Sequence, residues 1–122
     1  MSPSDPPFEA ETLERLRAGH ERLIQQVRRV VIGQDEALEA LVIALFTGGH
    51  ALLTGAPGLA KTLLIRTLAS ALDLPFRRIQ FTPDLMPADI TGSEIIDEDG
   101  VGGRRQWRFV PGPIFTNVLL AD

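Results

Sequence analysis

Apolar and charged residues alternate with a helical period along the first part of the chain. Leucine, isoleucine and valine recur at spacings of three, four and seven, and charged residues from Glu11 to Arg29 fill the opposite face. This pattern predicts an amphipathic helix. Its apolar positions are Leu13, Leu16, Leu23, Ile24, Val27 and either Val30 or Val31. A second helix is predicted from Gln34 to Phe46, because acidic residues in its first turn suit the positive end of the helix dipole and Gly48-Gly49 follows its last residue.

Shorter apolar runs bounded by glycine, proline or polar residues follow. The run from His50 to Thr54 predicts a buried parallel strand, and a third helix is predicted from Lys61 to Leu72. A second strand is predicted from Arg78 to Phe81, and the last apolar run, Val118 to Ala121, predicts another. Strands that alternate with helices are typical of an α/β fold.

The segment between the second and the last of these strands has a different pattern. Asp84 to Gly92 predicts one short helical turn with a loop. Ser93 to Ile96 and Gln106 to Val110 predict the two arms of a hairpin around the polar turn Asp97 to Gly103. At the N-terminus, residues 1–8 are rich in proline and predict a disordered lead, which leaves residues 9–122 as the folded part.

Trp107 in the hairpin allows more than one interpretation. Alternation along this arm places Trp107 and Phe109 on one face, which favours a solvated hairpin whose apolar side is packed. A contact with a protein substrate or a pore is a second interpretation. Single-stranded nucleic acid is a third, because arginines beside an aromatic ring can bind bases by charge and stacking. The arginines concerned are Arg104, Arg105 and Arg108.

The turn of this hairpin also carries three consecutive acids, Asp97, Glu98 and Asp99. A weak cation site is conceivable there, but the spacing is not that of a calcium-binding loop, and a solvated turn is the favoured interpretation.

Composition narrows the classes of function. The net charge of −4 argues against a general nucleic-acid coat, because phosphate neutralisation needs a basic excess. The absence of cysteine excludes disulfides, thiolate zinc sites and a cysteine nucleophile. No apolar run reaches the roughly 18 residues of a membrane span, so we expect no membrane insertion. We expect the protein to be cytoplasmic.

One segment has the pattern of a phosphate-binding loop, G-x-x-x-x-G-K-[ST], with alanine in place of the second fixed glycine. Backbone N–H groups of such a loop and of the helix after it bind phosphate oxygens, lysine reaches the β- and γ-phosphates, and the hydroxyl ligates Mg²⁺. The only lysine of the chain occupies the required position, which favours this interpretation over a simple Gly/Pro turn. The residues are Gly55, Ala56, Pro57, Gly58, Leu59, Ala60, Lys61 and Thr62.

A phosphate-binding loop of this type needs a second element: an apolar strand that ends in an aspartate, which holds the Mg²⁺ through water. Val118 to Ala121, followed by Asp122, has this form. A buried strand that ends in a solvated acid is the alternative, and the loop upstream favours the metal role.

Several further segments, taken together with the loop, resemble the N-terminal half of the nucleotide-binding core of MoxR-type AAA+ ATPases. The resemblance runs from about Leu23 to Asp122, and alanine at the Ala60 position is usual in that family. The segments that carry it are Val31 to Gln34, Gly48 to Leu53, Arg78 to Leu85, Pro87 to Gly92, Pro111 to Phe115 and Leu119 to Asp122.

The resemblance implies a three-layer P-loop core with a parallel sheet, in which the hairpin is an insert that interrupts the second core helix. It implies that ATP and Mg²⁺ are the cofactors, that Lys61 acts on the transferring phosphate and that Thr62 and Asp122 place the metal. The loop residues and Leu63 would hold the phosphates. The residues implied to lie beside the adenine are Val31, Ile32, Gly33 and Gln34.

Members of that family are similar to hexameric remodelling ATPases that act on protein clients, often with a partner that carries a von Willebrand factor A domain. The family's water-activating glutamate, its fourth and fifth core strands, its arginine finger and its helical lid would all follow Asp122. We therefore expect the chain to be a fragment that is marginally stable and does not turn over ATP alone. Two alternatives stay open: a non-catalytic nucleotide-binding or assembly module, and a P-loop small-molecule kinase.

Overall fold

The computed structural model describes residues 10–55, 59–98, 102–103 and 105–122. They belong to two compact units, Met1–Leu72 and Asp73–Asp122, and each is described by itself. The disordered lead predicted for residues 1–8 lies outside the described residues.

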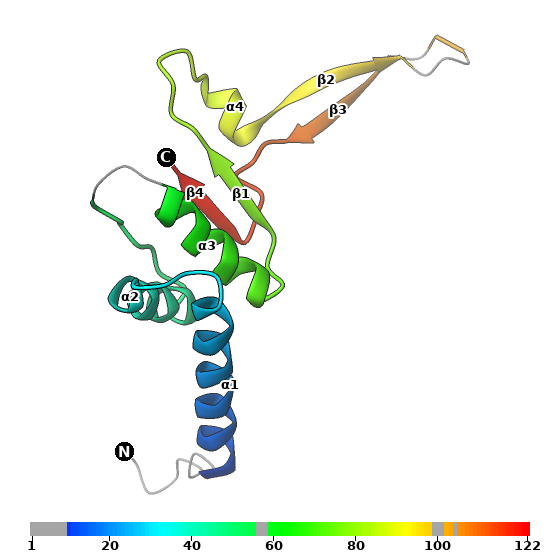
Figure 1. Ribbon diagram of the computed structural model, residues 1–122. Helices are drawn as coiled ribbons and strands as arrows, with labels where there is room; N and C mark the ends of the chain where they lie inside the picture. The colour runs from blue at the N-terminus through cyan, green and yellow to red at the C-terminus, as the bar shows by residue number, and fades with distance from the viewer. Residues whose placement is uncertain (1–9, 56–58, 99–101, 104) are drawn as a thin grey trace, which may run out of the picture. The chain divides into compact units, whose positions relative to one another are not determined.

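The first unit consists of three helices, all at the predicted places (Figure 1). They are α1 (Ala10–Arg28), α2 (Asp35–Phe46) and α3 (Leu59–Ala71). Helix α3 begins two residues before the predicted Lys61, and Asp73 with a φ of 53° follows its end. A left-handed residue after the last turn is a common way for a helix to stop.

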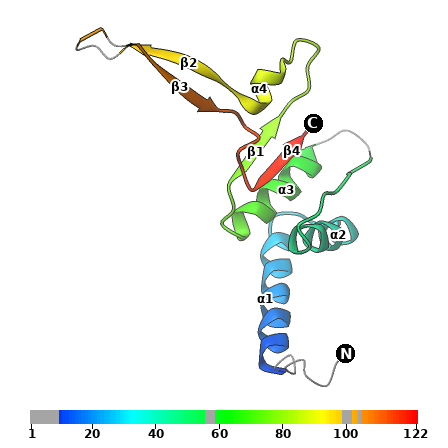
Figure 2. The ribbon, with the colours of Figure 1, turned by 180° about the vertical axis from the view of Figure 1, so that it is seen from behind.

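The core of this unit lies where the C-terminal half of α1 meets α2 and α3. The first half of α1 extends away from the other two helices, in Figure 1 and in the reverse view of Figure 2. Leu13 and Leu16 are therefore exposed, which corrects the expectation of one apolar face along the whole helix. The buried residues of the core are Leu23, Ile24, Val27, Val31, Leu38, Val42, Leu64 and Leu68.

The strand predicted from His50 to Thr54 is not formed. These residues have no regular secondary structure, and Leu52 is 89% exposed rather than buried. A strand exists only by hydrogen bonding to a neighbour. Within the described part of the chain the strands pair with one another, and none of them pairs with residues 50–54.

The second unit contains a pair of parallel strands, which confirms the α/β class. Strand β1 (Phe76–Ile79) pairs with β4 (Val118–Ala121) in the register Phe76↔Val118 to Ile79↔Ala121. Strand β1 begins two residues earlier than predicted, but the ladder extends to Phe81, whose N–H donates to the Asp122 carbonyl at 2.7 Å. The two strands lie side by side in Figures 1 and 2.

The predicted hairpin is present between these two strands in the sequence. Helix α4 (Pro87–Thr91) leads directly into β2 (Gly92–Glu98), which pairs antiparallel with β3 (Arg105–Pro111). At the base of the hairpin the backbones of Gly92 and Gly112 come so close that a Cβ on either would lie 2.3 Å from a carbonyl oxygen. Glycine is needed at both positions, and together they fix where the hairpin leaves the unit.

No helix in the described ranges combines the length and the apolar character that crossing a membrane requires.

Candidate functional site

The two ends of the predicted phosphate-binding loop meet in the first unit. The Lys61 ammonium donates a hydrogen bond to the Gly55 carbonyl at 3.1 Å. Gly55 has a φ of +155°, and a Cβ built there would lie 3.5 Å from Lys61 Cε and 3.6 Å from Nζ. The lysine side chain thus folds back over the first glycine. Three loop residues, Ala56, Pro57 and Gly58, lie outside the described residues.

The start of α3 supplies backbone donors beside that lysine. The first N–H groups of a helix have no acceptor within the helix and carry the positive end of its dipole. The first turn, which includes Ala60, Lys61 and Thr62, contains no acidic residue that would neutralise this end. Thr62 is half-buried, whereas Leu64 is fully buried in the core and anchors the helix. A cradle with a cation and free donors fits a polyphosphate.

The predicted adenine-side segment connects α1 to α2 in the same unit. Val31 is buried in the core, and its N–H donates to the Val27 carbonyl at 2.9 Å. Ile32 is 88% exposed, and Gly33 has a φ of +82°. Gln34 is the N-cap residue of α2, and its carbonyl accepts from Leu38 at 2.9 Å. The segment is therefore anchored at both ends and presents one apolar side chain to solvent.

Asp122 lies in the second unit, directly after β4. Its N–H donates to the Ile79 carbonyl at 2.8 Å, and its own carbonyl accepts from Phe81. The side-chain carboxylate accepts a hydrogen bond from the Arg78 guanidinium. This carboxylate is half-exposed, and hard carboxylate oxygens are ligands that suit Mg²⁺ directly or through water.

Arg78 is the residue at this site that the sequence analysis missed. It lies opposite Leu120 in the register, two residues before Asp122, so both side chains are on one face of the sheet. The alternation of side chains along each strand could have indicated this, but only once the register of the two strands was known.

Carboxylates of the described residues are not gathered into a cluster of the kind that binds a metal by itself. The described ranges hold no group of three or more His, Asp or Glu side chains placed to bind a metal. Asp97 and Glu98 lie at the end of β2 rather than in the predicted turn, because the strand pairing continues to Glu98. Asp97 pairs with Arg108 at 3.1 Å and Glu98 with Arg105 at 3.3 Å, which favours solvated ion pairs over a cation site. The third acid of the predicted turn, Asp99, lies outside the described residues.

The loop after β1 is held by side chains of its own. The Thr82 hydroxyl donates to the Asp84 carboxylate at 2.5 Å, and this bond, together with a backbone hydrogen bond, lowers the pKa of Asp84 below 3.8. Asp89 accepts from the Met86 N–H at 2.9 Å and so caps the start of α4.

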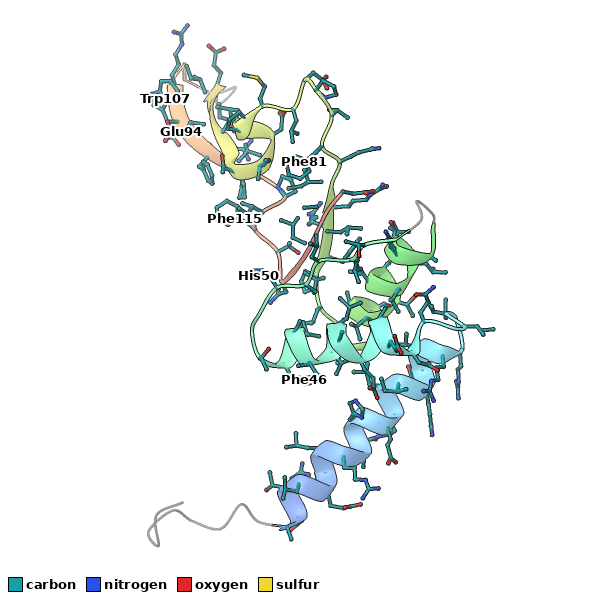
Figure 3. All side chains as sticks on the ribbon, turned by 90° about the vertical axis from the view of Figure 1, so that its left-hand side faces the viewer. Phe46, His50, Phe81, Glu94, Trp107 and Phe115 are labelled. Atoms are coloured by element: carbon teal, nitrogen blue, oxygen red, sulfur yellow. The ribbon has the colours of Figure 1, made fainter. Side chains whose placement is uncertain are left out.

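The apolar face of the hairpin is exposed, contrary to the expectation of a packed side. Trp107 is 70% exposed and lies on the hairpin well away from Phe115 (Figure 3). At the base, the rings of Phe109 and Phe115 meet edge to face with their centroids 5.9 Å apart. Among the described residues of the hairpin, this aromatic packing is at the base. Arg104, one of the three arginines near Trp107, lies outside the described residues.

Comparison with known proteins identifies relatives of this chain. The family described as "ATPase family associated with various cellular activities (AAA)" matches residues 50–122. Chaperone MoxR1 of Mycobacterium tuberculosis is 44% identical over 96% of the chain and 30% of that relative. Protein MoxR of Methylorubrum extorquens is 37% identical over 76% of the chain and 26% of its own length.

The chain is also similar to a solved structure. The crystal structure of a candidate ATPase from Cytophaga hutchinsonii matches with a TM-score of 0.75 and 43% identity. The match covers 94% of this chain and 35% of that one. The chain thus spans about a third of the length of the relatives that it matches.

Proposed function

The chain belongs to the AAA ATPase family, with MoxR proteins among its relatives, and we propose that it is the part of a MoxR-type ATPase that binds ATP and Mg²⁺. The observation that carries the proposal is the contact of Lys61 with Gly55 at the start of α3. This contact joins the only lysine of the chain to the first residue of the predicted phosphate-binding loop, which supports the proposal.

Each predicted residue then has a distinct task. Backbone N–H groups from Gly58 to Thr62 would hold the phosphates, with Leu63 in the turn that follows. Lys61 would stabilise negative charge on the transferring phosphate. The Thr62 hydroxyl and the Asp122 carboxylate would hold Mg²⁺, which when bound neutralises charge on the β- and γ-phosphate oxygens. Residues 31–34 would lie beside the adenine, where the exposed Ile32 offers apolar surface.

For the full-length protein we propose hydrolysis of ATP coupled to the remodelling or assembly of protein clients. A homo-hexamer, a cytoplasmic location and a partner with a von Willebrand factor A domain form part of this proposal. The chaperone name of the mycobacterial relative supports the protein client. The net charge of −4 supports a protein client over nucleic acid.

Two measurements on the full-length protein test the proposal. The first is the affinity for a fluorescent ATP analogue in Mg²⁺ and in EDTA. Thr62→Ala should lose most of the gain that Mg²⁺ provides, whereas Thr62→Ser, which keeps the hydroxyl, should retain it. Equal affinity of all three proteins in Mg²⁺ would contradict the metal role of Thr62.

The second measurement is release of inorganic phosphate from ATP. Release without any added small-molecule acceptor is the expected result for an ATPase. Nucleotide binding without release would instead support the non-catalytic module. Phosphate transfer that depends on a small-molecule acceptor would support the kinase.

A further inference from the structure

Strand β1 and Phe81, two residues after its end, hold Asp122 at three points. Two are backbone hydrogen bonds, from Asp122 to the Ile79 carbonyl at 2.8 Å and from Phe81 to the Asp122 carbonyl at 2.7 Å. The third is the ion pair between the Arg78 guanidinium and the Asp122 carboxylate. The backbone bonds set where the residue lies, and among the described residues it is the ion pair that sets the direction of its carboxylate.

The position of this ion pair in the fold suggests a use beyond surface charge pairing. Arg78 is the last residue but one of β1, and Asp122 directly follows β4. The pair therefore lies near the carboxyl ends of two parallel strands, which is the edge where open α/β sheets place their ligands. The guanidinium contacts one carboxylate oxygen, Oδ2. A carboxylate has further acceptor capacity on its second oxygen, which can still serve a cation or a water bound to it.

We propose that Arg78 is a positioning residue for Asp122: its guanidinium holds the Asp122 carboxylate in the orientation that Mg²⁺ binding requires. The inference rests on the proposed role of Asp122. Partners that orient a metal ligand typically change metal affinity by about 10–100-fold when they are removed. An exposed ion pair without such a role changes almost nothing.

The chain offers a matched control in the neighbouring arginine. Arg77 is exposed, carries the same charge and lies in the same strand, but the alternation of side chains puts it on the opposite face. Its removal takes away the same net charge without touching the carboxylate.

The experiment titrates Mg²⁺ into the full-length protein with a fluorescent ATP analogue and records the concentration for half-maximal binding. We expect Arg78→Gln to raise this concentration roughly 10-fold while affinity in EDTA stays unchanged. Arg78→Lys, which keeps a charged donor, should recover part of the loss, and Arg77→Gln should match the wild type. Should Arg78→Gln fold poorly in a thermal melt, the comparison of Arg78→Lys with Arg77→Gln carries the test.

Three outcomes would overturn the inference, and they separate it from the proposed function. A wild-type Mg²⁺ requirement in both Arg78 variants would make the contact an ordinary surface ion pair. A lower requirement in Arg78→Gln would mean that the guanidinium competes with the cation. An Asp122→Asn variant that binds the nucleotide with wild-type Mg²⁺ dependence would overturn the proposed metal role itself, and the role of Arg78 with it.

Discussion

The Lys61 ammonium lies 3.1 Å from the Gly55 carbonyl oxygen, so the last part of the loop motif reaches back to its first residue. Both residues are exposed or half-buried, and the hydrogen bond joins a charged donor to a backbone acceptor. Such a bond contributes little to folding at an exposed site, because water can replace either partner. The lysine is therefore free to exchange this acceptor for phosphate oxygens.

Lys61→Ala should separate binding from folding. We expect the affinity of the full-length protein for an ATP analogue to fall by at least about 10-fold, because a charge-assisted contact to phosphate is lost. The free energy of unfolding without nucleotide should change by less than about 1 kcal/mol. Fluorescence titration and a thermal melt measure the two quantities. Near-wild-type affinity would count against the phosphate-binding loop.

The leucines of the first unit should differ sharply in their effect on stability. Leu64 is 2% exposed in the core, and Leu64→Ala should cost about 2–5 kcal/mol by leaving a cavity. Leu16 is 58% exposed on the first half of α1, so Leu16→Ala should cost less than about 0.5 kcal/mol. Urea unfolding followed by circular dichroism compares them. A large cost at Leu16 would show that another part of the full-length protein covers this half of the helix.

Two Gly→Ala substitutions should have opposite effects on the stability of the folded protein. A Cβ on Gly112 would lie 2.3 Å from the Ile90 carbonyl oxygen and 2.5 Å from the Gly92 nitrogen, so the base of the hairpin must shift, at a cost of about 1–3 kcal/mol. Gly19 lies within α1 with nothing inside 4 Å of its Cβ position. Gly19→Ala should therefore stabilise the protein by roughly 0.5–1 kcal/mol. A melting temperature that stays the same or rises in Gly112→Ala would contradict this account of the hairpin base.

The pKa of Asp84 tests the hydrogen bond that Thr82 donates in the loop after β1. The Thr82 hydroxyl bond lowers the pKa of Asp84 below 3.8 in the folded chain. A lowered folded pKa contributes stability above pH 3.8, and this contribution is lost as the pH falls through the folded pKa. Thr82→Val should return the pKa toward 3.8, measured by carboxyl NMR against pH. An unchanged titration in Thr82→Val would show that the backbone bond is the main cause.

The sequence by itself determined the elements whose signal is local. The three helices, the hairpin and the strand from Val118 to Ala121 were all predictable, because periodicity and bounding glycines act within a few residues. The phosphate-binding loop motif and its lysine could be recognised for the same reason, because the motif is a continuous segment of the sequence. Their roles toward ATP and Mg²⁺ stay predictions.

Only the tertiary structure decided the features that depend on pairing between distant segments. Residues 50–54 have the composition of a strand but form none, because a strand needs a neighbouring edge. The exposure of Leu13 and Leu16 depends on how far α2 and α3 extend along α1. Arg78 meets Asp122 only because β1 and β4 adopt one register, and the register of parallel strands that lie far apart in the sequence is a long-range property that no local pattern encodes.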